Sequence, residues 1–152
     1  MFYALEIHVA LSLLIPLVGA LGIAITGRFP NIREAVTLAT AALLFANVMV
    51  ILPEVLAGAR PSFTLVTTIP GLDLSLSVEP LGMVFAAVAS TLWIINSLYS
   101  IGYMRGNNEA KQTRFYVCFA IAISATMGIA FAGNLLTLFV FYEVLSLSTY
   151  PL

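Results

Sequence analysis

Residues 5–26, LEIHVALSLLIPLVGALGIAIT, form an apolar stretch that decides the class of fold. A helix needs about 20 mostly apolar residues to cross the hydrocarbon core of a bilayer, and this stretch is long enough. Stretches of the same character follow over residues 32–56, 80–104, 113–132 and 135–152. The sequence therefore predicts an all-α integral membrane protein, with about five transmembrane helices in a single membrane domain over residues 1–152.

The composition supports a membrane location. Of the 152 residues, 61% are hydrophobic and 9% are charged, and the mean hydropathy is +1.07. A soluble domain has roughly a quarter of its residues charged, and a small water-soluble protein cannot bury so much apolar surface. The formal net charge is −1 and no basic tract is present, so nucleic acid is excluded as an expected partner. The expected surroundings are the lipid bilayer.

The placement of Lys and Arg predicts the orientation, because cytoplasmic loops carry an excess of these residues. Five of the six lie after the first and third predicted helices: Arg28, Arg33, Arg105, Lys111 and Arg114. On the opposite side lies Arg60 alone. We therefore expect the N-terminus outside and the C-terminus in the cytoplasm. Residues 1–10 contain no Lys or Arg, so a cleavable signal peptide is not expected.

The segment between the second and third predicted helices alternates apolar and polar residues. Residues 62–69 (SFTLVTTI) alternate in part, and in residues 72–78 (LDLSLSV) every even-numbered position is Leu or Val. This period of two on both sides of Pro70–Gly71 predicts an external β-hairpin over about residues 62–78. An isolated hairpin is marginally stable, so we expect it to lie against the outer helix ends or a neighbouring subunit.

Glu143 is the ionisable residue that the sequence places deepest in the membrane. Nine residues from Asn134, at a rise of ~1.5 Å each, place it about 14 Å along the fifth helix, near the middle of a core about 30 Å thick. Burial favours the neutral form of a carboxyl, which suits exchange of protons near neutral pH. Ser146 and Tyr150, at i+3 and i+7, share its helix face. They and Asn134 are predicted as supporting site residues.

The other ionisable and polar residues of the spans have ordinary interpretations. Interfacial positions at helix ends account for Glu6, His8, Glu54 and Glu79. Hydrogen bonds between helices, or the lining of a hydrated path, account for Asn47, Asn96, Ser124 and Thr126. The sequence contains no phosphate-binding glycine loop, HExxH motif, Ser/His/Asp set or histidine pair for haem. No catalytic site, metal or cofactor is therefore expected in this chain.

Two motifs resemble the antiporter-like membrane subunits. One is LYSIGYM at residues 98–104; the other is GNLLTLF at residues 133–139, which continues through Phe141-Tyr142-Glu143 to Ser148-Thr149-Tyr150. This family comprises the large proton-pumping subunits of respiratory complex I, the A and D subunits of Mrp-type sodium/proton antiporters, and relatives in membrane-bound hydrogenases. The order of three leading helices, an outer hairpin after the second, and a tightly connected fourth and fifth also resembles the family.

The resemblance implies a role for Glu143. It matches the family's essential glutamate on the fifth transmembrane helix, which works with a lysine on a later, broken helix in a charge-coupled proton channel. The family has considerably more helices than this chain, so we expect a split or truncated subunit whose partners are other membrane subunits, one of them supplying the intramembrane lysine. An inner (plasma) membrane location fits the family.

Two functions are compatible with the sequence. The first is a proton-translocating component of a multisubunit cation/proton antiporter or of a redox-driven, complex I-like pump. The alternative is a structural or assembly subunit without transport activity, in which Glu143 only ties helices together. The two differ in whether Glu143 faces a hydrated interior with a cationic neighbour or dry apolar surroundings.

Overall fold

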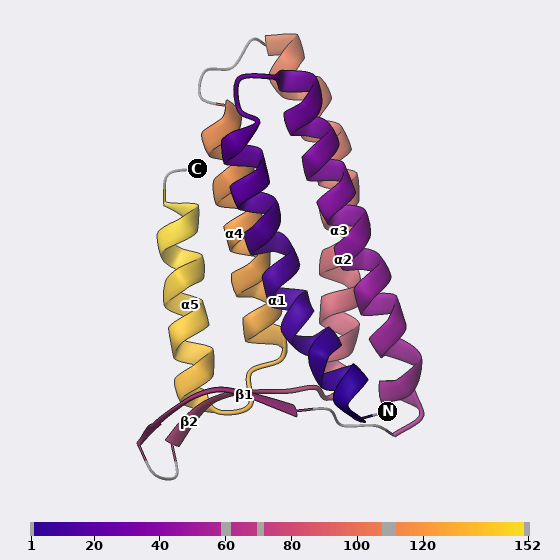
Figure 1. The fold of residues 1–152 in the computed structure, drawn as a ribbon, viewed down its shortest axis with the longest axis vertical. Coiled ribbons are helices and arrows are strands. Elements are labelled where there is room, and N and C mark those ends of the chain that lie inside the picture. Colours follow the sequence, from indigo (N-terminus) through magenta and orange to yellow (C-terminus); the bar gives the residue numbers. More distant parts are fainter. Residues whose placement is uncertain (1, 59–61, 70–71, 108–111, 151–152) are drawn as a thin grey trace.

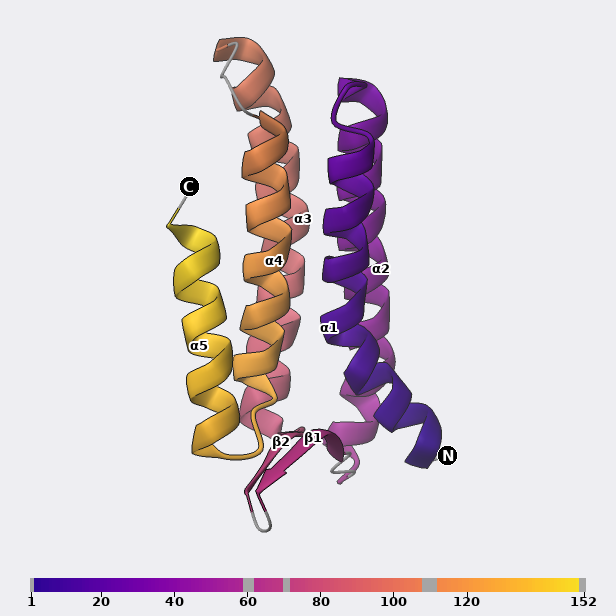
Figure 2. The same cartoon turned by 60° about the vertical axis from the view of Figure 1, so that its left-hand side comes forward.

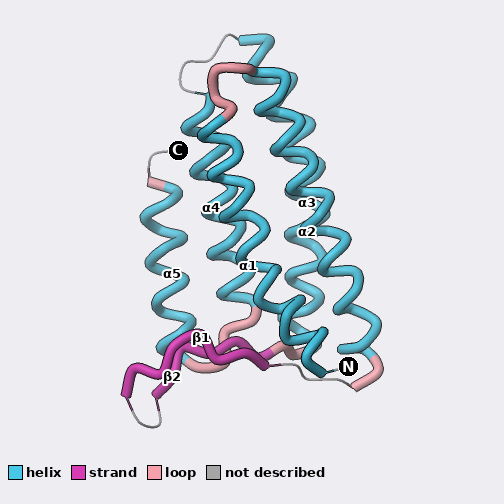
Figure 3. The backbone as a smooth tube through the Cα atoms, viewed as in Figure 1, coloured by secondary structure: helices cyan, strands magenta, loops and turns pink. Residues whose placement is uncertain are grey.

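The computed structural model describes residues 2–58, 62–69, 72–107 and 112–150. Its elements, in chain order, are α1 (Phe2–Ile25), α2 (Pro30–Leu56), β1 (Ser62–Ile69), β2 (Leu72–Ser77), α3 (Pro80–Asn107), α4 (Gln112–Ala130) and α5 (Leu135–Thr149). The helices run side by side, and the two strands lie across one end of the bundle (Figures 1 and 3). We call this end, which also holds the beginning of α1, the strand end, and the other the turn end.

In the described part of the chain, four helices are long and apolar enough to cross a membrane. These spans are Glu6–Ile25, Asn31–Leu56, Pro80–Tyr103 and Thr113–Ala130. The fifth helix, α5, is apolar too, but its 15 described residues fall below the roughly 20 that a full span requires. The chain is therefore a multi-pass, all-α membrane protein, as the apolar stretches predict.

Apolar side chains fill the interior and also cover the outside. α1 packs against α2 and α4, α2 packs against α3, and α5 packs against α4 at the edge of the bundle (Figure 2). The largest fully buried side chains include Ile23, Leu44, Ile51, Trp93, Met127 and Phe131. Leu21, Leu81 and Leu98 are among the large apolar residues that point outward. Helices that are apolar all round are typical of a bilayer environment.

A proline bends the first helix. Pro16 lies inside α1, where it removes a backbone hydrogen bond and favours a kink. Figure 2 shows the N-terminal turns of α1 inclined to the rest of the helix. Near this bend, Ser124 Oγ of α4 donates a hydrogen bond to the Leu13 carbonyl at 2.8 Å. Ser124 therefore joins two helices, as its position in a span predicts.

The two strands pair antiparallel and close the strand end. Ser62 pairs with Ser77 and Phe63 with Leu76, with register shifts further along β1. Leu76 and the following Val78 are fully buried, in keeping with the alternation in the sequence. β1 contacts α1 and β2 contacts α5, so the strands lie on the helix ends. The predicted turn at Pro70–Gly71 lies outside the described residues.

At the turn end, α2 begins earlier than the sequence indicates. Pro30 occupies its first turn, a position that proline favours. Arg33, the second residue of the predicted helix, is therefore the fourth residue of α2. It is only 5% exposed, and the neighbouring Glu34 is 6% exposed.

Arg33 joins α2 to α4. Its Nη1 donates to Thr113 Oγ1 at 3.1 Å, and its Nη2 lies 3.7 Å from Glu34 Oε1. The guanidinium carbon lies 5.3 Å from the centre of the Tyr116 ring. A buried charge is tolerated where it is paired and hydrogen-bonded, and these three contacts meet that requirement.

Candidate functional site

The start of α5 is fixed by its N-cap residue. Asn134 has an extended backbone, and its Oδ1 accepts hydrogen bonds from the Thr137 amide at 2.8 Å and from Thr137 Oγ1 at 2.9 Å. Asparagine is a preferred N-cap residue because its side chain satisfies an amide that lacks a helical partner. The structure thus gives Asn134 a capping role at the end of the helix that carries Glu143.

The strand β2 holds the connection between α4 and α5. The Ser77 amide donates to the Phe131 carbonyl at 2.6 Å, and the Gly133 amide donates to the Ser75 carbonyl at 2.9 Å. A Cβ on Gly133 would lie 2.6 Å from Ser75 Oγ, so glycine permits this close approach. The Ser75 amide in turn donates to Thr137 Oγ1 at 2.9 Å. These bonds set the position from which α5 rises.

One face of α5 packs on α4. Thr137 and Ser148 are its buried residues, and Phe141 is packed against the hydrophobic core. A Cβ on Gly128 of α4 would overlap the Phe141 ring. The absence of a side chain at Gly128 thus allows α5 to approach α4 closely at the level of Phe141.

Glu143 lies on the opposite, outward face of α5. It is exposed, as are Phe139 (62%) and Leu147 (72%) one turn before and after it. The predicted supporting residues Ser146 and Tyr150 are exposed as well, and Tyr150 is 91% exposed. Glu143, Ser146 and Tyr150 therefore share one face, as their spacing predicts. Asn134 is directed to Thr137 and does not join them.

The outward face provides no counter-charge within the described residues. Among these residues, the Glu143 carboxylate has neither a hydrogen bond nor an ion pair, and the Ser146 and Tyr150 side chains have no hydrogen bond to it. A charge facing lipid near the middle of a helix costs about 3 kcal/mol on insertion scales. The carboxyl therefore requires a proton, a polar partner or water beside it.

A second polar site lies at the strand end of α1 and α2, and sequence reasoning missed it. His8 Nδ1 lies 2.6 Å from Asn47 Oδ1, and Asn47 also contacts Ser12 of α1. The two residues are 39 positions apart and were interpreted separately. Each of two adjacent spans carries a polar side chain, His8 on the first and Asn47 on the second. This is the feature of the sequence that could have suggested a contact between them.

The other polar residues of the spans have different surroundings. Thr126 Oγ1 donates within its own helix to the Ala122 carbonyl at 2.8 Å. Glu79 is exposed at the start of α3, where its carbonyl accepts from the Met83 amide at 2.9 Å. Glu6 and Glu54 are half-buried at the strand end of α1 and α2.

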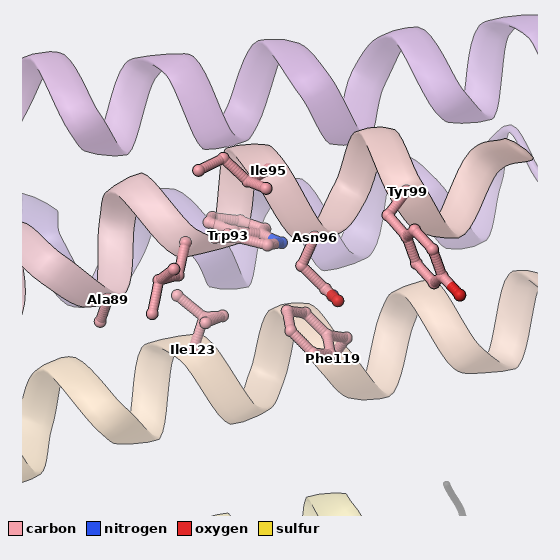
Figure 4. A pocket seen from close by; sticks show the side chains of 8 residues that line it. Ala89, Trp93, Ile95, Asn96, Tyr99, Phe119 and Ile123 are labelled. Carbon is pink, nitrogen blue, oxygen red and sulfur yellow. The ribbon is translucent and has the colours of Figure 1, made fainter. Parts of the chain in front are cut away.

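A groove of about 580 Å³ opens between α3 and α4. Its lining is mostly apolar and includes Trp93, Asn96 and Tyr99 of α3 and Phe119 of α4. Figure 4 shows the Asn96 side chain directed from α3 towards Phe119. The groove is on α3 and α4, not on the outward face of α5 that carries Glu143.

Comparison with known proteins identifies relatives. No profile of a known protein family matches the chain. It is 30% identical over 81 residues to NAD(P)H-quinone oxidoreductase subunit 5, organellar chromatophore 1, of Paulinella chromatophora. It is 29% identical over 82 residues to the A1 subunit of a Na+/H+ antiporter of Staphylococcus aureus, and 30% identical over 79 residues to the corresponding A subunit of Alkalihalophilus pseudofirmus. The resemblance to the antiporter-like membrane subunits that the motifs predict is thereby confirmed.

These matches cover 52–54% of this chain and 10–12% of the length of each relative. In structure, the chain is similar to a chain of the membrane-bound sulfane sulfur reductase, an archaeal respiratory membrane complex, with a TM-score of 0.76. That likeness covers 92% of this chain and 22% of the other, at 19% identity, and it shows the fold alone.

Proposed function

We propose that this chain, a relative of the antiporter-like membrane subunits, is a proton-translocating component of a multisubunit cation/proton antiporter or of a redox-driven, complex I-like proton pump. In this proposal Glu143 carries the proton. The observation that supports it most is the exposure of Glu143 on the otherwise mostly apolar outward face of α5. A carboxyl at that place is costly against lipid, so another protein segment or hydrated space covers it.

The partner in this proposal is a lysine on a membrane segment outside this chain. A cation that approaches Glu143 stabilises the carboxylate, and its withdrawal favours proton uptake. Alternation of the two states, with access to each side of the membrane in turn, moves a proton. Ser146 and Tyr150 share the face of Glu143 and are placed to hold water or donate hydrogen bonds to it. Asn134 supports the site by fixing the start of α5.

The proposal includes an orientation and a location. The strand end faces the outside and the turn end faces the cytoplasm of a cell bounded by an inner (plasma) membrane. The exposed Arg28 and Arg114 at the turn end support this orientation. Residues 1–152 act as one membrane domain, and the paired strands form an external hairpin that turns at Pro70–Gly71.

The experiment is proton flux in vesicles that contain the whole assembled complex, with Glu143→Gln compared to wild type. Glutamine keeps the size and hydrogen bonding of the residue but removes its titratable proton. Glu79→Gln is the matched control, because Glu79 is an exposed glutamate at the end of a helix. We expect Glu143→Gln to reduce flux to background, with normal assembly, and Glu79→Gln to leave it unchanged.

The opposite result would favour the alternative function. If Glu143→Gln transports protons like wild type, Glu143 is not the carrier, and the chain acts as a structural or assembly subunit. Glu143→Asp provides an intermediate variant, because aspartate keeps a titratable carboxyl on a side chain that is shorter by one methylene group. Partial flux in Glu143→Asp is expected if the distance to the cationic partner matters.

A further inference from the structure

A closed hydrogen-bond network joins α1 and α2 at the strand end. Asn47 Nδ2 donates to the His8 carbonyl at 2.8 Å and to Ser12 Oγ at 2.9 Å. Ser12 Oγ donates to the His8 carbonyl at 3.0 Å. The fourth contact joins Asn47 Oδ1 and His8 Nδ1, 2.6 Å apart. Ser12 is fully buried and Asn47 is 6% exposed, whereas His8 is half-buried.

The network fixes the position of the hydrogen on the imidazole. A backbone carbonyl can only accept, so the Asn47 group that faces the His8 carbonyl is the NH2 group. The amide oxygen of Asn47 therefore faces His8 Nδ1. Because that oxygen can only accept, Nδ1 carries the hydrogen and donates. In the neutral imidazole the other nitrogen, Nε2, then has a free lone pair.

We propose that His8 is a proton-binding residue at the strand end of the bundle, with Nε2 as the accepting atom and Asn47 as the positioning residue. A proton that binds Nε2 converts the ring to imidazolium, which keeps hydrogen on both nitrogens. The bond from Nδ1 to Asn47 is retained and becomes charge-assisted. Proton uptake therefore leaves the contact between α1 and α2 intact, so a proton can bind and leave without separation of the helices.

The charged groups around His8 are few. On α1, Glu6 is half-buried two residues away. On α2, Glu54 is half-buried two helical turns beyond Asn47, on the same helix face. The half of α4 nearest the strand end, residues 123–130, and β1 contain no ionisable residue in their sequences. Among the described residues, two carboxyls and no Lys or Arg lie at this end of the helix pair, which suits a site that gains positive charge. Arg60, which the sequence places on the same side, lies outside the described residues.

The first test reads the imidazole directly. His8 is the only histidine of the chain, so its nitrogen signals can be isolated in the native complex by magnetic resonance with isotope-labelled histidine, after subtraction of the His8→Gln spectrum. We expect hydrogen on Nδ1 and none on Nε2 at high pH. On acidification we expect Nε2 to gain the proton while Nδ1 keeps its own.

Two variants make this test decisive. Asn47→Leu removes the acceptor of Nδ1, and we expect the neutral ring to move its hydrogen to Nε2. Asn96→Leu is the matched control, an asparagine in another span that lines the α3–α4 groove, and we expect the Nδ1–H form to persist. The proposal is overturned if wild type carries its hydrogen on Nε2 at high pH, if Asn47→Leu has no effect, or if Nε2 takes up no proton on acidification.

The use of this proton in transport rests on the proposed function, and flux tests it separately. We expect His8→Gln to slow proton uptake from the strand end several-fold at near-neutral pH, and Asn96→Leu to have no such effect. If Glu143→Gln transports normally, the proposed function fails. The magnetic resonance measurement still tests whether His8 binds a proton at Nε2, because it does not depend on transport. If His8→Gln transports like wild type while Glu143→Gln does not, the transport role of His8 is wrong.

Discussion

At the scale of single residues, Thr137 connects β2 to the start of α5 through one hydroxyl group. Its Oγ1 accepts from the Ser75 amide of β2 and donates to Asn134 Oδ1 at the start of α5. Thr137→Val keeps the shape of the side chain but leaves the half-buried Ser75 amide without its acceptor. A buried polar group left unsatisfied costs about 1–3 kcal/mol. We expect Thr137→Val to lower the free energy of unfolding by about that amount, measured by titration with a denaturing detergent.

Thr149→Val provides the comparison for this prediction. Thr149 is an exposed threonine on the same helix, and its Oγ1 donates to the Leu145 carbonyl within α5. Because that carbonyl belongs to the helix itself, we expect a change in unfolding free energy well below that of Thr137→Val. Equal effects of the two variants would mean that the bond between β2 and α5 does not stabilise the fold.

Local spacing predicts the shared face of Glu143, Ser146 and Tyr150, because three and seven residues return to the same side of any helix. Spacing along one helix could not predict the pair of His8 and Asn47, since that pair depends on how α1 and α2 are rotated about their axes. The burial of Arg33 was missed for a related reason. The sequence places Arg33 near the start of a helix but does not show which way its side chain points. With α2 starting at Pro30, the side chain is directed towards Thr113 and Tyr116 of α4.

At the scale of elements, the contact between α4 and α5 depends on Gly128. A Cβ at this position would overlap the Phe141 ring, and overpacking of this kind costs about 1–3 kcal/mol. We expect Gly128→Ala to destabilise the protein by about that much and to displace α5. Gly128→Ala should lower the free energy of unfolding less in a Phe141→Ala background than in wild type, because residues in direct contact are energetically coupled.

Gly102→Ala is the matched control in α3. In the described part of the structure, a Cβ at Gly102 meets nothing within 4 Å. Alanine is favoured over glycine in a helix by about 1 kcal/mol, so this variant should be neutral or more stable. If both glycine variants are equally stable, close approach of α5 to α4 is not a requirement of the fold.

Helix ends are less predictable than helices. Long apolar stretches indicate where the chain crosses the membrane, but the last residues of each helix depend on contacts made elsewhere. α4 ends at Ala130, two residues before the predicted end, where the Phe131 carbonyl accepts from Ser77 and Ala132 forms an isolated bridge to Leu76. No local signal at residues 130–132 predicts these bonds, because they come from a strand more than fifty positions earlier.

At the scale of the whole molecule, the two ends of the bundle differ in charge. Arg28, Arg33 and Arg114 lie at the turn end, with Glu34 as the acidic residue paired to Arg33, whereas Glu6, Glu54 and Glu79 lie at the strand end. Lys and Arg, unlike Asp and Glu, decide which side of a helical protein stays in the cytoplasm. The separation therefore predicts one orientation in the membrane.

Single cysteines at the two ends test that orientation in intact cells. The one native cysteine, Cys118, is first replaced by Ala. Phe29→Cys then introduces an exposed thiol at the turn end without removal of an arginine, and Glu79→Cys introduces one at the strand end. We expect a membrane-impermeant maleimide to label position 79 in intact cells, and position 29 only after the membrane is opened. Labelling in the reverse order would invert the proposed topology and would place His8 on the cytoplasmic side. Labelling of both positions in intact cells would mean that the chain inserts in two orientations, which a charge difference of this size should prevent.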